Sequence, residues 1–323
     1  MRRRDVLQTL GTAVTATTVG TLPTTAAEGT YTDEYYDGLH YTKYVPSGAS
    51  GGEPLLVMLH GCSQEPDEFA AATGMNDVAE RENAVVVYPD QSSFANGFDC
   101  WNWYYDYNTA RGSGEGASIT NVALRAVDRE SLDRDRIYLA GFSAGAAMVP
   151  NLLASYADVY AAGGVHSGLE YDAAETATGA TGVMAFGGPN PYDQGEQAYR
   201  SMVDDEIVDR VPTVVVHGTD DDTVDVVNGD QVRTQAVETN DLVDGADDES
   251  VNTEPDDRVY DSEGGYDYRR DRYTDSRGRV NVEYWLVEGM GHEWAGGDTG
   301  EYVAPDAPSA SDALWSFFER WSL

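Results

Sequence analysis

The sequence has very little basic character, and this scarcity narrows the classes of partner that the protein can have. Of its 323 residues only one is lysine, Lys43, and the 20 basic side chains stand against 57 acidic ones, so the formal charge is −37. A nucleic acid carries dense negative charge and is repelled by such a chain unless a basic stripe offsets the repulsion. The sequence contains no such stripe, so we predict no nucleic-acid partner.

The charged residues are also unusual in kind. Asp outnumbers Glu by 35 to 22, and 19 of the 20 basic residues are arginine. A surface with few lysines and many carboxylates stays hydrated in concentrated salt, where screening removes the self-repulsion of so many charges. This composition favours a halophilic protein, and an acidic protein from an ordinary habitat is the alternative.

The N-terminal segment lacks the roughly 20 consecutive apolar residues that a membrane-spanning helix needs. Arginines at positions 2–4 precede a weakly apolar, threonine-rich stretch that ends in small residues at Ala26 and Ala27. This pattern is typical of an export signal, and the paired arginines favour the twin-arginine route. No cysteine precedes Cys62, which excludes a lipid-bearing cysteine at the cleavage point. We therefore predict a signal over residues 1–27 and an extracellular protein without a stable membrane anchor.

From about residue 38 onward, short apolar runs rich in β-branched residues alternate with helical patterns. This alternation predicts an α/β fold with a mainly parallel central sheet and helices on both faces. No linker interrupts the remaining chain, so we expect a single domain over residues 28–323. Residues 246–265 are acidic and poor in apolar side chains, which predicts a solvated excursion without packing. Strands are expected at 54–60, 84–89, 136–141, 160–168, 211–218 and 280–289, and helices at 118–131, 144–156, 230–242 and 306–321.

The strongest local signal for chemistry is the run GFSAGAAM at residues 141–148. A G-x-S-x-G sequence that follows an apolar strand and opens a helix lifts its serine hydroxyl above the edge of the sheet. Gly141 and Gly145 are small at positions where side chains would collide with neighbouring backbone. The helix start also presents free N–H groups and a positive dipole, which suit an oxyanion. We predict that Ser143 is a nucleophile.

A serine nucleophile needs a base, and the chain has only five histidines. In this architecture an acid and then a histidine follow the serine, each after a later strand. His292 is the only histidine late enough in the chain and is the predicted base. Asp220, Asp221 and Asp222 follow the strand at 211–218, and the pattern alone does not choose the acid among them. His60, His166 and His217, each at a strand end, are expected to be structural, and His40 lies in an early strand.

The oxyanion hole needs two N–H donors. Ala144 supplies one, directly after the predicted nucleophile. The second is expected from the run LHGCSQ at 59–64, where Gly61 lets the backbone approach closely and the N–H of Cys62 then points at the site.

The second cysteine, Cys100, lies in an aromatic loop at residues 96–108. An even pair of cysteines in an exported chain suggests one disulfide, between Cys62 and Cys100, and two free buried thiols are the alternative. The aromatic side chains of this loop and one beside the predicted base are candidates for the substrate cleft, with a place in the core as the alternative. These candidate substrate-binding residues are Trp101, Trp103 and Trp294.

Together these residues resemble the polyhydroxybutyrate (PHB) depolymerase family of esterases, which have the α/β-hydrolase fold and are similar to certain feruloyl and acetylxylan esterases. The resemblance covers most of the chain after the signal and includes LHGCSQ, CWNWYYDYN, GFSAGAAM and VVVHGTDDDTV. The family pattern H-G-x-x-D-x-x-V, placed on His217, Gly218 and Val224, implies that Asp221 is the acid. It also implies the roles given above to the serine, the histidine and the oxyanion donors, and a bridge between the two cysteines.

We therefore expect an exported serine carboxylesterase that works through an acyl-enzyme, with oligomers or polymers of hydroxybutyrate or other hydroxyalkanoates as substrate. The alternatives are a feruloyl or acetylxylan esterase and, from another class, a non-catalytic surface-binding protein. No cofactor is predicted. No group of histidine, cysteine or carboxylate residues has zinc spacing, and residues 220–230 do not match a calcium loop, so no metal is predicted either.

Overall fold

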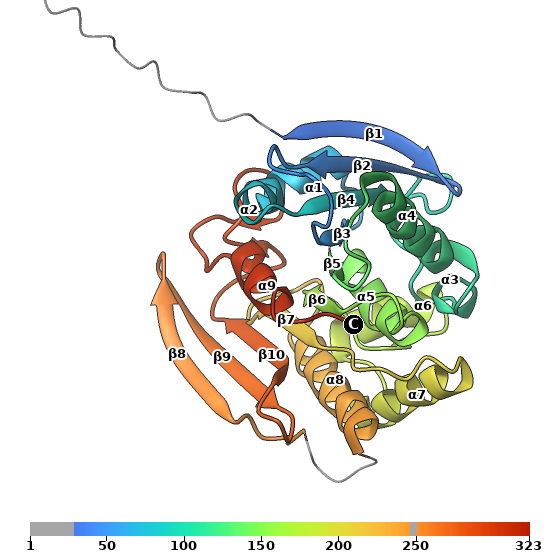
Figure 1. Cartoon of the computed structure of the whole chain (residues 1–323). Coiled ribbons are helices and arrows are strands. Elements are labelled where there is room, and N and C mark those ends of the chain that lie inside the picture. Colours follow the sequence, from blue (N-terminus) through green and yellow to red (C-terminus); the bar gives the residue numbers. More distant parts are fainter. Residues whose placement is uncertain (1–28, 246–250) are drawn as a thin grey trace, which may run out of the picture.

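The computed structural model of the protein describes residues 29–245 and 251–323. The predicted export signal lies outside these residues. The described chain forms a ten-stranded sheet in the order β1-β2-β4-β3-β5-β6-β7-β10-β9-β8, with helices packed against it (Figure 1). The strands are β1 (Thr30–Tyr36), β2 (Leu39–Val45), β3 (Leu55–Leu59), β4 (Val85–Asp90), β5 (Ile137–Phe142), β6 (Ala162–His166), β7 (Thr213–Gly218), β8 (Asp257–Glu263), β9 (Tyr266–Thr274) and β10 (Val280–Val287).

The middle of the sheet is parallel and its two edges are antiparallel. Strands β4, β3, β5, β6, β7 and β10 run in the same direction. Strands β1 and β2 extend one edge and strands β9 and β8 the other, all in antiparallel pairing. Every residue of β3, β5, β6 and β7 is buried, because helices cover both faces of the central strands. This arrangement confirms the predicted α/β class.

The two large apolar cores lie one on each face of the sheet. Alternate side chains of β3 enter different cores: Leu55, Val57 and Leu59 belong to one, and Leu56 and Met58 to the other. Helices α4, α5 and α8 contribute to the first core, and α1, α2 and α9 to the second (Figure 1). The helices are α1 (Pro66–Thr73), α2 (Met75–Glu82), α3 (Asp106–Thr109), α4 (Gly114–Glu130), α5 (Ala144–Ser155), α6 (Ala177–Phe186), α7 (Pro191–Asp204), α8 (Val227–Gly245) and α9 (Ala310–Phe318).

The six predicted strands are present as β3, β4, β5, β6, β7 and β10, and the four predicted helices as α4, α5, α8 and α9. The prediction for residues 246–265 is wrong in part. Residues 257–263 form β8, which pairs with β9 from Asp257 opposite Arg272 to Glu263 opposite Tyr266. An edge strand whose side chains are mostly exposed needs no alternating apolar pattern, so its sequence resembles a loop. Positions 246–250 of this segment lie outside the described residues.

The helices do not meet the requirements of a membrane span. Among residues 29–245 and 251–323, no helix combines the length and the apolar character needed to cross a bilayer.

Candidate active site

Ser143 occupies a sharp turn between β5 and α5. Its backbone has φ 55° and ψ −119°, a left-handed φ that is rare for a residue with a side chain and that places the serine at the tip of the turn. The turn requires glycine on both sides of the serine. A Cβ on Gly141 would lie 2.4 Å from the carbonyl carbon of Gly145, and a Cβ on Gly145 would lie 2.2 Å from the carbonyl oxygen of Leu59. The predicted strand–serine–helix geometry is therefore present.

Asp221 and His292 form a direct pair at the carboxyl ends of β7 and β10. Nδ1 of His292 lies 2.8 Å from Oδ2 of Asp221, and the carboxylate has no exposed side-chain surface. Its other oxygen, Oδ1, accepts hydrogen bonds from the backbone N–H groups of Thr223 at 3.0 Å and Val224 at 2.8 Å. Burial alone would raise the pKa of Asp221. The hydrogen bonds from His292 and Val224 lower it by more than burial raises it, so the pKa of Asp221 is below its usual value.

The structure also separates the three consecutive aspartates. Asp220 and Asp222 are exposed, whereas Asp221 is buried against His292. The residue implied by the family pattern is thus the one that contacts the histidine.

The ring of His292 lies beside the turn that carries Ser143. Its centroid is 4.8 Å from that of Phe142, the residue that precedes the serine. Because Asp221 engages Nδ1 of the ring, the second nitrogen, Nε2, remains available for proton transfer. The carboxyl ends of β5, β7 and β10 therefore bring the three predicted triad residues to one region of the sheet edge.

The loop after β3 is held in place by buried hydrogen bonds. Nε2 of His60 accepts a bond from the N–H of Gln91 at 3.0 Å, which leaves its Nδ1 to donate to the carbonyl of Gly61 at 2.7 Å. The N–H of Gly61 in turn donates to Oε1 of Gln64 at 2.8 Å. A Cβ on Gly61 would lie 3.3 Å from Cβ of Ser143, so the loop passes very close to the serine.

The two predicted oxyanion donors flank this close approach. Ala144 is the first residue of α5, where N–H groups have no acceptor within the helix. The N–H of Cys62 has no hydrogen-bond acceptor in the part of the chain that the structure describes. Cys62, Ala144 and Ser143 line the same pocket. Both amides are thus suited to bind an oxyanion.

Cys62 and Cys100 are joined by a disulfide, as predicted. The bridge links the loop after β3 to the aromatic loop, and a hydrogen bond of 2.8 Å from the N–H of Ser63 to the carbonyl of Phe98 adds a second connection. The oxyanion loop and one wall of the pocket are therefore fixed to each other.

The pocket above Ser143 has a volume of about 540 Å³ and contains no Asp, Glu, Lys or Arg side chain. Its aromatic loop side includes Trp103, as predicted, but Trp101 and Trp294 are not on its wall. Trp101 is completely buried, and Trp294 is 1% exposed and stacks on the ring of His166 at 4.7 Å between centroids. Their assignment to substrate binding is wrong, because aromatic character in the sequence does not reveal how deep each ring lies.

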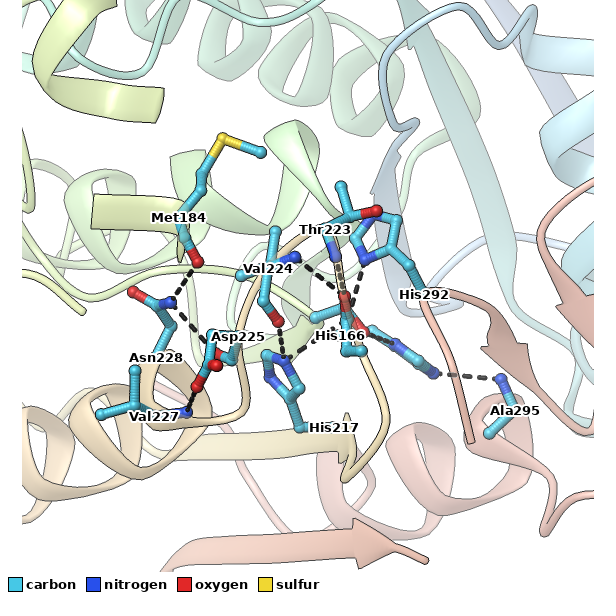
Figure 2. A network of polar contacts seen from close by, with 12 residues as sticks. His166, Met184, His217, Thr223, Val224, Asp225, Val227, Asn228, His292 and Ala295 are labelled. Atoms are coloured by element: carbon cyan, nitrogen blue, oxygen red, sulfur yellow. Dashed lines mark hydrogen bonds and ion pairs between the residues drawn. The ribbon is translucent and has the colours of Figure 1, made fainter. Parts of the chain in front are cut away.

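Another wall of the pocket comes from α6, a helix that is not among those predicted from the sequence. This helix presents Ala177, Ala180, Thr181 and Met184 to the pocket. Figure 2 shows how α6 is attached to the loop that carries the acid: the carbonyl of Met184 accepts bonds from the N–H of Asp225 at 2.8 Å and from Nδ2 of Asn228 at 3.0 Å. Small apolar residues give no sequence signal that distinguishes a pocket wall from core.

Two further histidines support the site from within. Nε2 of His217 donates to the carbonyl of Val224 at 2.8 Å, because a carbonyl can only accept, and Nε2 of His166 accepts from the N–H of Ala295 at 3.0 Å (Figure 2). Both rings are fully buried, and burial lowers the pKa of each, which favours the neutral form. They act as fixed connections between loops, in agreement with the structural role predicted for them.

The parallel sheet, the turn at Ser143 and the acid and histidine after later strands define the α/β-hydrolase fold. Residues 39–256 match the family model described as "Esterase PHB depolymerase". The chain belongs to this family.

Individual relatives agree with that membership. Poly(3-hydroxyalkanoate) depolymerase C of Paucimonas lemoignei is 31% identical over 255 residues, which are 79% of this chain and 58% of that protein. Feruloyl esterase B of Thermothelomyces thermophilus is 31% identical over 139 residues, 43% of this chain and 47% of that protein. The chain thus spans about half the length of these relatives. A solved acetyl xylan esterase from Aspergillus awamori, 16% identical, superposes with a TM-score of 0.68 over 91% of this chain and 99% of its own and has the same fold.

The described residues offer no cluster of metal ligands. Within 29–245 and 251–323, no group of three or more His, Cys, Asp or Glu side chains is arranged to hold a metal ion.

Proposed function

We propose that the protein is a serine carboxylesterase that hydrolyses its substrate through an acyl-enzyme, with Ser143 as nucleophile, His292 as base and Asp221 as orienting acid. The observation that carries this proposal is the strained turn of Ser143, which lines the pocket, together with the bonded pair of Asp221 and His292, whose imidazole ring packs against the neighbouring Phe142. A buried carboxylate beside a histidine has this role in serine hydrolases, because it fixes the tautomer and stabilises the imidazolium ion.

The reaction proceeds in two stages. Oγ of Ser143 attacks the ester carbonyl while Nε2 of His292 takes its proton, and the N–H groups of Cys62 and Ala144 bind the oxyanion. The proton then passes from His292 to the leaving alcohol as the C–O bond breaks, which leaves an acyl group on the serine. Water, deprotonated by the same histidine, attacks the carbonyl of this ester, and the proton passes from His292 to Oγ of Ser143 as the C–O bond breaks and the acid is released.

For the substrate, we propose esters of hydroxyalkanoic acids, as oligomers or polymer. The relative that aligns over 79% of this chain is a poly(3-hydroxyalkanoate) depolymerase. A pocket without charged side chains also suits a neutral aliphatic polyester. Feruloyl and acetyl esters of polysaccharides are the second candidate, because other relatives of this chain are named feruloyl esterase and acetylxylan esterase. Side-by-side rates on hydroxybutyrate oligomers, feruloylated xylan and acetylated xylan distinguish the two.

The catalytic assignment is tested by Ser143→Ala, measured with a p-nitrophenyl ester. We expect kcat to fall by several orders of magnitude, because the triad acts as a unit. A fluorophosphonate should label the wild-type protein stoichiometrically and leave the variant unlabelled. Wild-type rates in the variant, or folded wild-type protein that stays unlabelled, would contradict the assignment and favour a binding protein.

We further propose that the protein is exported and works in concentrated salt. The twin arginines near the start and the formal charge of −37 support these two points. Replacing Arg2, Arg3 and Arg4 by lysine should keep the protein inside the cell if the twin-arginine route is used. Activity and folding measured from low to molar salt should rise with salt, and an optimum at low salt would contradict the halophilic part.

A further inference from the structure

Three phenylalanines of this protein lie on its surface. The chain contains seven phenylalanines, and four of them are at most 2% exposed, whereas Phe94 is 100%, Phe98 73% and Phe186 86% exposed. A phenylalanine ring has no polar atom, so its exposure to water is unfavourable. A charged surface that exposes three such rings calls for an explanation.

The three rings come from the two segments that form the walls of the active-site pocket. Phe98 lines the pocket itself, and Phe94 is adjacent to the pocket residue Ala95. Phe186 is the last residue of α6, two residues after the pocket residue Met184. We call Phe94, Phe98 and Phe186 the apolar rim.

The loop of the apolar rim is fixed by its own hydrogen bonds. Oγ of Ser92 accepts a bond from the N–H of Phe94 at 3.1 Å, and Oδ1 of Asn96 accepts one from the N–H of Phe98 at 3.0 Å. The disulfide at Cys100 then joins this loop to the oxyanion loop. These bonds hold the backbone at Phe94 and Phe98 in a defined place beside the site.

A small ester does not account for the rim. Phe94 and Phe186 are not on the pocket wall, so an ester enclosed by the pocket leaves both rings in water. A ligand that covers these two rings as well as filling the pocket extends beyond the pocket.

Charge restricts the nature of that ligand. With a formal charge of −37, the chain repels a second copy of itself, an acidic protein or an anionic membrane. An uncharged surface is not repelled, and its apolar contact with the rim is strengthened by many salts. The absence of charged side chains from the pocket fits the same kind of ligand.

We propose that the apolar rim adsorbs the protein to the surface of a solid, uncharged polyester, so that a polymer chain enters the pocket and reaches Ser143. The proposal rests on the esterase function above. It adds the surface on which the part of the substrate outside the pocket binds. Phe94 and Phe186 contact the solid outside the pocket, and Phe98 forms the transition between the solid and the pocket.

The test uses the double variant Phe94→Ser/Phe186→Ser, whose positions lie outside the pocket. The matched control is Tyr35→Ser/Tyr260→Ser, which removes two rings that are 63% and 69% exposed on β1 and β8, at the two ends of the sheet. Adsorption to PHB granules is measured by sedimentation with Ser143→Ala in every chain, so that no polymer is consumed. Hydrolysis of granules and of p-nitrophenyl butyrate is measured with Ser143 intact.

We expect the rim variant to adsorb at least tenfold more weakly and to hydrolyse granules correspondingly more slowly, with kcat/KM for the soluble ester unchanged. The control should behave like the wild type. Unchanged adsorption of the rim variant, an equal loss in the control, or tighter binding of the parent to neutral lipid vesicles than to granules would overturn the proposal. An absence of soluble-ester hydrolysis by the wild type would instead contradict the esterase function, while the adsorption measurement would still test the rim.

Discussion

The parallel strands in the middle of the sheet and the antiparallel strands at its edges belong to one hydrogen-bonded layer, but their side chains have different surroundings. In the middle, at the end of β7, the carboxylate of Asp221 is buried and bonded from several sides, by His292 and by two backbone amides. At the edges, β1 and β8 expose almost every residue, and their ion pairs include a solvent-exposed arginine, as in Arg129–Glu34 and Arg258–Asp271.

This difference shows where the protein can position chemistry. The buried carboxylate of Asp221 keeps one geometry, because each of its oxygens is hydrogen-bonded and little solvent competes. An exposed ion pair contributes little and changes partners easily. Substitutions should therefore have large effects in the middle of the sheet and small ones at its edges, and the following experiments test this gradient.

The largest expected effect after loss of the nucleophile comes from Asp221→Asn. The change preserves the shape of the side chain but favours the wrong tautomer of His292, so we expect kcat on a p-nitrophenyl ester to fall by about four orders of magnitude. The matched variants Asp220→Asn and Asp222→Asn change exposed neighbours and should leave kcat nearly unchanged. Equal losses in all three variants would mean that the acid is assigned wrongly.

The disulfide should have the next largest effect. The double variant Cys62→Ala/Cys100→Ala opens a bridge between residues 38 apart, and we expect the free energy of unfolding to fall by about 3 kcal/mol. We also expect kcat to fall, because the oxyanion loop loses its connection to the aromatic loop. Denaturant unfolding and ester hydrolysis measure the two effects. A reducing agent should lower the stability and kcat of the wild type and leave the double variant unaffected. If the wild type with its disulfide fully reduced kept its stability and kcat, this role of the disulfide would be contradicted.

A pH-dependent effect is expected at Glu170, which follows β6 near the site. It is 1% exposed, neither carboxylate oxygen has a hydrogen-bond partner among the described residues, and burial raises its pKa from 4.5 to about 8. Between these two values the folded protein holds a proton that the unfolded chain releases. The contribution of Glu170 to stability is therefore greatest below pH 4.5 and is lost as the pH rises toward 8.

We thus expect Glu170→Gln, which cannot ionise, to lose less stability than the wild type as the pH increases. The difference in the free energy of unfolding should grow by up to roughly 1.4 kcal/mol per pH unit between about pH 5 and 8 and then level off. Thermal unfolding across this range measures it. Glu175→Gln, at an exposed position of the same segment, is the control and should show no such trend. If the difference in the free energy of unfolding between Glu170→Gln and the wild type did not depend on pH, this interpretation would be wrong.

The smallest effect is expected at the edge strand β8. Arg258 pairs with Asp271 on β9 at 2.6 Å, but Asp271 is also within 3.1 Å of Arg269. Arg258→Gln should therefore lower the free energy of unfolding by about 1 kcal/mol or less and leave ester hydrolysis unchanged. A tenfold loss of activity would show that the edge is coupled to the site and would contradict the proposed gradient.

The same contrast explains which parts of the fold were predictable. The central strands β3, β4, β5, β6 and β7 are short, mainly apolar runs because both of their faces are buried, and such runs are visible in the sequence. Strand β8, with the sequence DRVYDSE, has no such pattern because its side chains face water. Its identity as a strand comes from backbone pairing with β9, which composition does not reveal.

The site shows a similar division. The context of Ser143 and the late position of His292 were sufficient to select these two residues, but three adjacent aspartates were equivalent until the family pattern was applied. Trp101, Trp103 and Trp294 were likewise equivalent as aromatic residues, and only Trp103 lies on the pocket wall. The wall formed by α6 had no signal at all, because alanine and threonine occur in cores, helices and clefts alike.

The sequence by itself determined the α/β class, the order of the central strands along the chain and the chemical groups available for a nucleophile, a base and an acid, since these follow from local periodicity and from the scarcity of histidine and cysteine. Only the tertiary structure decided which aspartate is buried against His292, which rings lie in the core and which phenylalanines surround the pocket. The physical reason is that burial and hydrogen-bond partners arise from segments far apart in the chain. Residues identical in type acquire different roles only when those segments meet.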